Sequence, residues 1–222
     1  MQDQPAELEW RDGSVPVSVR FDDPYFSLDN GLAETRHVFL SGNDLPWRFR
    51  DGFAIAELGF GTGLNFLTSW AAWRAAGVSG RFHFTSFEAY PMAPADMALA
   101  HAAFPELAPL AQALVDTLGA DGRSTFEDAT LEVIAGDARE TLPNWLGQAD
   151  AWFLDGFSPA KNPEMWGPDL MAEVARHTRP HGTAATYTAA GFVRRGLEAA
   201  GFDVTRASGF GRKRHMTRAV LR

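Results

Sequence analysis

A run of three glycines that interrupts an apolar segment constrains the fold of this chain more than any other feature. Residues 53–58 are apolar and predict a buried strand, Gly59, Gly61 and Gly63 follow at alternate positions, and residues 63–76 predict a helix. A strand, a tight glycine turn and a helix N-terminus together form a cradle for a small ligand. The chain is therefore expected to have an α/β fold with a ligand bound at this turn.

A carboxylate follows each of the next three predicted parallel strands. In an open parallel sheet, ligands bind outside the carboxyl ends of the strands, so these acids are expected to line one pocket with the glycine turn. The acids are Glu88 after RFHFTSF, Asp137 after LEVIAG and Asp155 after AWFL.

The spacing of the glycines distinguishes between classes of nucleotide ligand. A dinucleotide fingerprint needs a small third residue, and Leu64 occupies that position, which argues against a nicotinamide cofactor. With Glu57 before the first glycine, the pattern E-x-G-x-G-x-G resembles motif I of S-adenosylmethionine-dependent methyltransferases. Glu88 suits a ribose diol, because an ionised carboxylate can accept both hydroxyls at about 1.5–3 kcal/mol each. Asp137 and the backbone N–H of Ala138 are expected to bind the adenine edge.

The composition fits a globular enzyme of one domain with an appendage. The chain has 222 residues, of which 45% are hydrophobic and 12% aromatic. The absence of cysteine excludes disulfides, thiolate nucleophiles and cysteine zinc sites, and the six histidines lack metal-site spacing, so no metal is expected. A polar, acidic start and the lack of a long apolar run predict a cytoplasmic protein without membrane association.

Strands and helices alternate from residue 52 onward. The alternation predicts a Rossmann-like domain over residues 51–222, with its last two strands paired as an antiparallel ribbon. Residues 1–50 do not alternate; they contain an Asp12-Gly13 turn and a short helix over GLAETRHVFL, and we expect them to form an N-terminal cap. The expected strands are 53–58, 81–87, 130–135, 150–154, 183–187, 202–207 and 215–221. The expected helices are 63–76, 138–146, 164–177 and 190–200, and further helical stretches are expected from 94 to 118.

The segment WFLDGFSPAKNPEMW predicts a rigid loop directly after Asp155. Gly156, Pro159 and Pro163 stop helix formation and restrict the loop to one shape. A carboxylate followed by an aromatic-bearing loop at this strand end is where amine-directed methyltransferases place the target nitrogen. The residues expected to contact the substrate here are Phe157, Lys161, Asn162 and Trp166, although either aromatic could instead belong to the core.

Several further strings carry a more specific resemblance. GLAETRHVFLSGNDLPWRF, ELGFGTGLNF, WFLDGFSPAKNPEMW, TYTAAGFVRRGL and GFGRKRHM together resemble the methyltransferase domain of the MnmC family, whose stand-alone form is called MnmD, over about residues 20–217. The resemblance implies a seven-stranded Rossmann-like fold and N-methylation of the 5-aminomethyl group of wobble 2-thiouridine in tRNA, with S-adenosylmethionine as methyl donor.

Bifunctional members of that family continue into an FAD-dependent oxidase. This chain ends at Arg222, where the oxidase half would begin, so we expect a methyltransferase without FAD and, if the oxidase is needed, a separate partner.

The charge distribution bears on whether the chain can bind RNA. The net charge of −8 is unfavourable for a polyanionic partner, but Arg194–Arg222 holds eight Lys and Arg residues against two acidic ones. Arg212, Lys213 and Arg214 are therefore expected to contact phosphates of a tRNA anticodon loop, unless they are ordinary solvated cations. Extruding a loop nucleotide costs little, and Phe157 or Trp166 could stack on the base at roughly 1–3 kcal/mol.

The expected chemistry assigns the central role to Asp155. Methyl transfer requires a neutral amine, and Asp155 is expected to accept its N–H hydrogen bonds beside the cofactor and to face the positive charge that develops on nitrogen. The sequence leaves open whether Asp155 also removes a proton. Two other functions share the fold: an aminopropyltransferase of the spermidine synthase type, which would need an acidic groove, and a non-catalytic RNA-binding relative, which would not need the glycines and the three acids.

Overall fold

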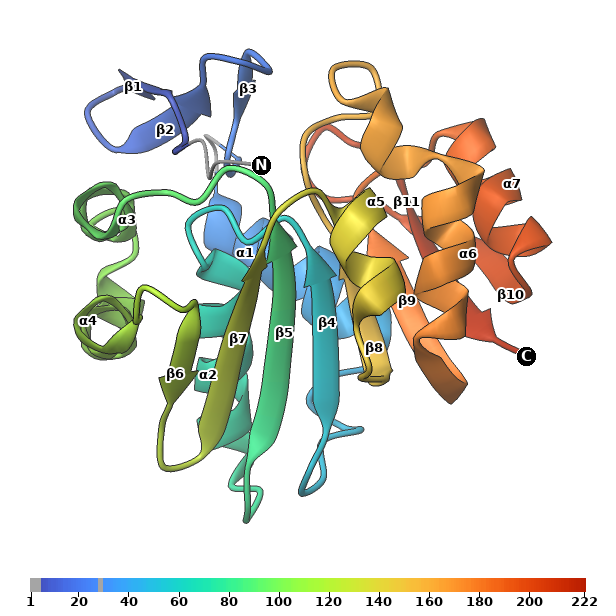
Figure 1. Ribbon diagram of the computed structural model, residues 1–222, viewed down its shortest axis with the longest axis horizontal. Coiled ribbons are helices and arrows are strands. Elements are labelled where there is room, and N and C mark those ends of the chain that lie inside the picture. The colour runs from blue at the N-terminus through green and yellow to red at the C-terminus, as the bar shows by residue number, and fades with distance from the viewer. Residues whose placement is uncertain (1–4, 28–29) are drawn as a thin grey trace.

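The computed structural model describes residues 5–27 and 30–222 and contains a twisted eight-stranded sheet (Figure 1). Its strands are β4 (Ala54–Leu58), β5 (Phe82–Glu88), β6 (Arg123–Thr125), β7 (Ala129–Ala135), β8 (Ala149–Leu154), β9 (Thr178–Thr186), β10 (Phe202–Ser208) and β11 (His215–Leu221). Their order across the sheet is β10-β11-β9-β8-β4-β5-β7-β6.

The pairing of the strands confirms the predicted Rossmann-like arrangement. Strands β7, β5, β4, β8 and β9 run parallel, whereas β11 lies antiparallel between β9 and β10 and forms the expected ribbon with β10. Strand β6 was not predicted, because three residues are too few for an alternating pattern; it pairs antiparallel with β7 at the edge of the sheet.

Helices cover both faces of the sheet. Successive side chains of each strand point to opposite faces, so both faces are apolar and need cover. In β4, Ile55 packs into the cluster under α1, α2 and α4, whereas Ala56 packs into the cluster under α5, α6 and α7. The helices are α1 (Gly31–Thr35), α2 (Leu64–Ala76), α3 (Pro94–His101), α4 (Ala108–Thr117), α5 (Ala138–Thr141), α6 (Pro168–Arg176) and α7 (Gly191–Ala199). Shorter helical turns span Arg36–Leu40, Ser41–Asn43, Pro105–Leu107, Leu142–Asn144 and Pro163–Trp166.

The helical stretches predicted from 94 to 118 are α3 and α4 in the structure. They are separated around Phe104, before Pro105, because a residue that precedes proline is disfavoured in the helical conformation. None of the helices in the described ranges is long and apolar enough to cross a membrane.

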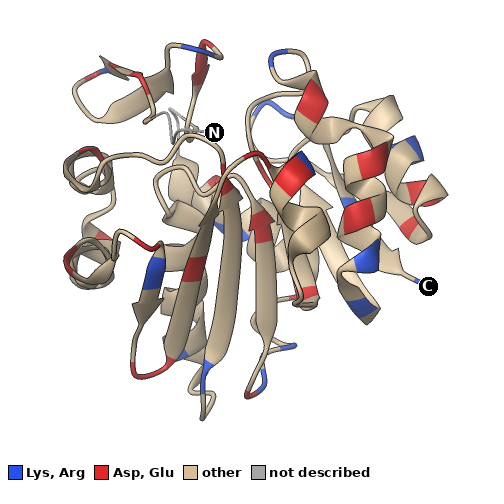
Figure 2. Cartoon of the chain, in the orientation of Figure 1, with Lys and Arg blue, Asp and Glu red and all other residues tan. Residues whose placement is uncertain are grey.

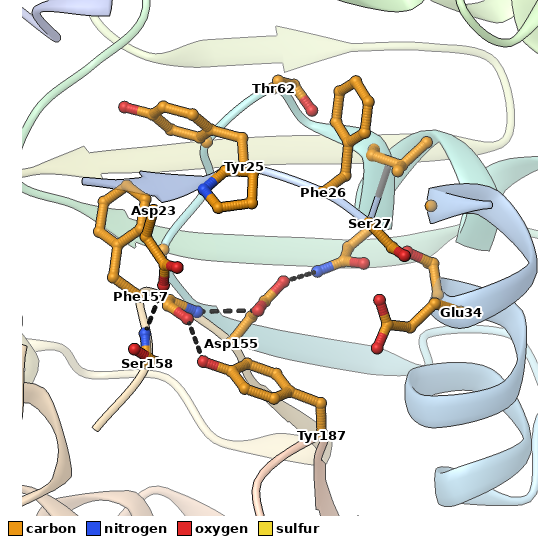
Figure 3. A pocket seen from close by; sticks show the side chains of 18 of the residues that line it. Asp23, Tyr25, Phe26, Ser27, Glu34, Thr62, Asp155, Phe157, Ser158 and Tyr187 are labelled. Carbon is orange, nitrogen blue, oxygen red and sulfur yellow. Dashed lines mark hydrogen bonds between the residues drawn. The ribbon is translucent and has the colours of Figure 1, made fainter. Parts of the chain in front are cut away.

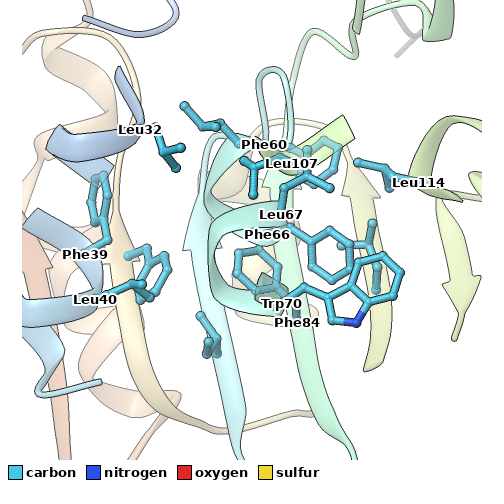
Figure 4. Packing of buried hydrophobic residues seen from close by; sticks show 14 of the residues in the cluster. Leu32, Phe39, Leu40, Phe60, Phe66, Leu67, Trp70, Phe84, Leu107 and Leu114 are labelled. Carbon is cyan, nitrogen blue, oxygen red and sulfur yellow. The ribbon is translucent and has the colours of Figure 1, made fainter. Parts of the chain in front are cut away.

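Aromatic side chains dominate the core between α2 and the sheet (Figure 4). Phe66 of α2 contacts Phe84 of β5 edge to face at 5.5 Å between ring centroids, a favoured geometry for aromatic pairs. Trp70, one turn further along α2, is 1% exposed and donates its indole N–H to Asp128 at 2.7 Å. These contacts fix the helix that begins at the glycine turn, and thereby the turn itself.

A small separate sheet lies above the carboxyl ends of the central strands (Figure 1). It contains β1 (Leu8–Arg11), β2 (Val15–Ser18) and β3 (Asp23–Pro24), all antiparallel. The predicted turn between β1 and β2 is present, with φ of 50° at Asp12 and 74° at Gly13. The boundary of the predicted N-terminal cap at residue 50 stays a prediction.

Candidate active site

A cavity of about 560 Å³ opens at the carboxyl ends of the parallel strands. Its walls come from the glycine turn, the ends of β5 and β8, the N-terminal sheet, α1 and the loop between β10 and β11 (Figure 3). The cavity therefore lies where the predicted glycines and carboxylates were expected to meet.

The glycine turn packs too closely against its neighbours to accept side chains. Gly59 has φ of 82°, and a Cβ atom there would lie 3.3 Å from the Cα of Gly156. Gly61 has φ of 54°, and its Cβ would lie 3.0 Å from the ring of Tyr25. Positive φ and close approach are both met by glycine at little cost. Gly63, with φ of 77°, directly precedes the first residue of α2.

Glu57, the residue before the turn, is completely buried beneath the cavity. Its carboxyl accepts hydrogen bonds from the Ser86 hydroxyl and the Asn65 amide, both at 2.7 Å. Burial raises its pKa well above the ordinary value, against the opposing effect of the two donors. The contact of Glu57 with Asn65 positions the first turn of α2. The role of Glu57 in cofactor binding stays a prediction.

Glu88 holds the glycine turn from the adjacent strand. One carboxylate oxygen accepts the backbone N–H of Gly61 and the other that of Tyr90, each at 2.8 Å. The side chain lines the cavity but is only 8% exposed, and burial raises its pKa despite the backbone donors. The predicted contact of Glu88 with a ribose stays a prediction.

Asp137 and Ala138 take different positions at the end of β7. Ala138 is buried and lines the cavity. Asp137 caps α5 by accepting the backbone N–H of Arg139 at 2.9 Å, and its carboxylate also pairs with the Arg139 guanidinium, whose hydrogen bond lowers the pKa of Asp137. The predicted adenine contact of these two residues stays a prediction.

Asp155 lies at the centre of the cavity (Figure 3). Its Oδ1 accepts the backbone N–H of Gly156 at 2.9 Å, and its Oδ2 accepts the Asn65 amide at 2.7 Å. Burial raises the pKa of Asp155 to about 6. Beside it, Tyr187 donates its hydroxyl to the backbone oxygen of Gly156 at 2.8 Å.

The two aromatics of the predicted loop have different environments. Phe157 lines the cavity, stacks on Phe21 with 4.6 Å between centroids and meets Tyr25 edge to face at 5.1 Å. Trp166 is 1% exposed and donates its indole N–H to the backbone oxygen of Phe157 at 3.0 Å. For Trp166 the core alternative therefore holds, and Phe157 is the aromatic that a substrate could reach.

The polar residues of the same loop also separate. Asn162 lines the cavity, whereas the ammonium of Lys161 reaches the backbone oxygen of Asp22 and lies 3.7 Å from Asp23. Asp23 in turn accepts the backbone N–H of Ser158 at 2.9 Å. Lys161 thus ties this loop to the N-terminal sheet.

The three predicted RNA-binding cations differ as well. Arg212 and Lys213 line the cavity, and Lys213 pairs with Glu34 at 2.7 Å, whereas Arg214 is exposed beyond the cavity wall. The predicted contact of these cations with tRNA phosphates stays a prediction. Acidic segments mark the upper ends of the central strands, and both basic and acidic segments occur in the part of the chain above them (Figure 2). No cluster of three potential metal ligands occurs among the residues in the described ranges.

Residues 105–222 match the model of a family described as S-adenosyl-L-methionine-dependent methyltransferases. This match spans more than half of the sequence. The chain belongs to this family. The methyltransferase fold predicted from the sequence is confirmed, and the cavity at the glycine turn is the place where such enzymes are expected to bind S-adenosylmethionine.

Solved structures agree with this assignment. MnmC2 from Aquifex aeolicus is 26% identical, with a TM-score of 0.76 over 100% of this chain and 72% of that chain, which confirms the resemblance to the MnmC methyltransferase domain. TrmN from Thermus thermophilus is 15% identical with a TM-score of 0.51, covering 82% of this chain and 47% of that chain. Precorrin-6y C5,15-methyltransferase from Geobacter metallireducens is 15% identical with a TM-score of 0.50, covering 86% of each chain. The last two share the fold alone.

Asn65, Tyr187 and Glu34 are among the wall residues that were not predicted from the sequence. Asn65 was a polar residue at the second position of an otherwise apolar helix start, which is the signal that could have indicated it. Tyr187 follows the end of β9, where the parallel-sheet rule also applies. Glu34 lies in the N-terminal segment, and nothing in its local pattern indicates that α1 faces the cavity.

Proposed function

We propose that this methyltransferase transfers a methyl group from S-adenosylmethionine to the 5-aminomethyl group of wobble 2-thiouridine in tRNA. The observation that carries the proposal is the half-buried carboxylate of Asp155 in a cavity that is also lined by an aromatic ring, Phe157. The 26% identity with MnmC2 over the whole chain supports this substrate.

The residues present fit the methyl donor. Gly59 and Gly61 border the cavity without a side chain, Glu88 offers carboxylate oxygens for a ribose, and Ala138 also lies on the wall. The donor supplies an electrophilic methyl group on a sulfonium. We assign Glu57, Gly59, Gly61, Gly63, Glu88, Asp137, Ala138 and Asp155 to cofactor binding.

Asp155 then orients the acceptor amine. As an ionised acceptor it takes the N–H hydrogen bonds and directs the nitrogen lone pair at the methyl group. The bound donor would supply the methyl group to the nitrogen by cleavage of its S–C bond, whose electron pair would stay on sulfur. The positive charge gained by the nitrogen would then lie beside the carboxylate of Asp155. The proton leaves afterwards to Asp155 or to water.

The tRNA would enter over the aromatic wall of the cavity. Phe157 and Asn162 are placed to contact the wobble base, and Arg212 and Arg214 to contact anticodon-loop phosphates. We further propose that the enzyme acts in the cytoplasm, after a separate FAD-dependent oxidase. It would itself bind neither FAD nor a metal.

Labelled methyl transfer tests this function. The wild-type protein should methylate tRNA that carries 5-aminomethyl-2-thiouridine, and nucleoside mass spectrometry should place the methyl group on the amine. The Asp155→Asn variant should bind S-adenosylmethionine in calorimetry but transfer no methyl group. Aminopropyl transfer from decarboxylated S-adenosylmethionine to a polyamine would indicate an aminopropyltransferase instead, and tRNA binding without a calorimetric response to S-adenosylmethionine would indicate a non-catalytic relative.

A further inference from the structure

Lys213 is held at the cavity by two residues from distant parts of the chain. Its ammonium lies 2.7 Å from Oε1 of Glu34 and 4.2 Å from the centroid of the Tyr187 ring. Figure 3 shows Glu34 and Tyr187 beside Asp155, on the wall of the same cavity. The side chain of Glu34 is 14% exposed and that of Lys213 is 48% exposed, so the pair lies at the rim with its carboxylate facing inward.

Other charged groups in the cavity are already paired or assigned. Asp23 of β3 accepts Ser158 and lies near the Lys161 ammonium. Glu88 of β5 is held by two backbone donors. The remaining charged groups on the cavity wall are Glu34 from α1, Asp155 after β8, and Arg212 and Lys213 from the loop before β11.

The uncharged titratable groups add no further charge to the cavity. Burial raises the pKa of both Tyr25 and Tyr187, which keeps these phenols neutral at physiological pH. Tyr90 is the third phenol on the wall, and the buried Glu57 lies below, hydrogen-bonded to Ser86.

An amine that enters beside Asp155 therefore meets the carboxylates of Asp155 and Glu34 and the ammonium of Lys213, while the exposed guanidinium of Arg212 is assigned to phosphate contact. Two carboxylates would stabilise the protonated amine, which has no lone pair for methyl transfer. Lys213 offsets Glu34 and leaves the charge of Asp155 alone to orient the amine. The charges of Lys213 and Glu34 both reach this position, since they change the pKa of Asp155 in opposite directions.

We propose that Lys213, held by Glu34 and Tyr187, is an active-site cation that favours the neutral form of the target amine. This inference rests on the proposed function, because it requires an amine as the substrate. It also separates Lys213 from Arg212 and Arg214, which we assign to phosphate contact.

The pH dependence of kcat at saturating tRNA and S-adenosylmethionine tests the proposal, because kcat reports the pKa values of the bound complex. Two groups titrate in this profile, Asp155 at the lower pH and the amine at the higher pH, and the midpoint compared is that of the amine. In Lys213→Gln the amine should lose its proton only at higher pH, so this midpoint should rise by about one pH unit, the low end of the shift that a nearby charge causes. Glu34→Gln should lower the midpoint. The Lys213→Gln/Glu34→Gln double variant has a neutral pair, so its midpoint should return to within a few tenths of a pH unit of wild type. Lys213→Arg keeps the positive charge and should keep the wild-type midpoint.

Arg206→Gln is the matched control, since Arg206 is an exposed cation of β10 away from the cavity wall. It should leave the midpoint unchanged. Calorimetric S-adenosylmethionine affinity within twofold of wild type shows that each variant is folded. If the Lys213 and Glu34 variants all lost kcat without any change of midpoint, the proposal would be overturned. It would also be overturned if the sole effect of Lys213→Gln were a higher KM for tRNA. Wild-type protein that binds S-adenosylmethionine but leaves the amine unmethylated would overturn the proposed function, and this inference with it.

Discussion

The side-chain amide of Asn65 donates to Oδ2 of Asp155 at 2.7 Å and so fixes the central carboxylate of the cavity to the first turn of α2. The same nitrogen also donates to Glu57 at 2.7 Å. One amide group therefore separates two carboxyls whose charges would otherwise repel each other. The strand that ends in Asp155 and the helix that follows the glycine turn are aligned by this contact.

Replacing Asn65 with alanine should reduce both stability and turnover. Two buried carboxyls would each lose a donor, at about 1–3 kcal/mol for each unsatisfied group. Misplacement of Asp155 should lower kcat by up to about 10²-fold. Urea unfolding and single-turnover methyl transfer measure the two effects. Thr68→Ala, which removes a hydroxyl bonded only to the backbone of the same helix, should leave turnover unchanged; equal losses of turnover in both variants would contradict the role of Asn65.

Turnover should fall as the pH is lowered through about 6, because burial raises the pKa of Asp155 to that value and only the ionised form accepts N–H bonds. The same group has an ordinary pKa of 3.8, so the folded state binds its proton more tightly than the unfolded state does. The contribution of Asp155 to unfolding free energy therefore decreases as the pH rises through that interval. Urea unfolding of Asp155→Asn at several pH values should show a smaller decrease than wild type.

Glu88→Ala should weaken S-adenosylmethionine binding by about 10²-fold, the loss expected for two charge-assisted hydrogen bonds at the low end of their range. Glu88→Gln keeps the shape of the side chain and one acceptor oxygen. Its affinity for S-adenosylmethionine should lie between those of wild type and Glu88→Ala. Glu132→Ala on the neighbouring strand removes an exposed acid that pairs with Arg123 and serves as the control. Calorimetric affinities that are the same for Glu88→Ala and wild type would show that the ribose binds elsewhere.

The Arg212→Ala/Arg214→Ala double variant should raise the KM for tRNA and reduce the salt dependence of binding by about one unit of slope for each phosphate that is no longer neutralised. Both side chains are exposed. Affinity for S-adenosylmethionine should stay within about twofold. Arg123→Ala on β6, at the opposite edge of the sheet, should change neither quantity. An unchanged KM and slope in the double variant would remove these arginines from the RNA site.

The two aromatics of the loop after Asp155 should respond in opposite ways. Trp166→Ala creates a cavity in the core and should cost about 3–5 kcal/mol of unfolding free energy. Phe157→Leu should be milder in unfolding but should raise the KM for tRNA, since it removes the face available for base stacking. A greater loss of stability in Phe157→Leu than in Trp166→Ala would reverse this assignment.

The sequence predicted the parts of the site that depend on local pattern. The glycines after β4 and the acids at the ends of β5 and β8 converge because parallel strands end at one edge of a sheet. Their convergence can therefore be predicted without knowledge of the tertiary packing. Asp137 shows the limit of this rule: its position was predicted, but its carboxylate turns to cap α5 and pair with Arg139. Glu34 reaches the cavity only through the packing of the N-terminal segment, which no periodicity encodes.

The walls of the cavity come from residues as far apart in sequence as Asp23 and Lys213. A partly folded chain therefore has no complete binding site, and a ligand in this cavity binds the native state alone. By mass action, a ligand present at a hundred times its dissociation constant would add about 2.7 kcal/mol to the free energy of unfolding. The cellular supply of S-adenosylmethionine would then govern the lifetime of the enzyme as well as its turnover.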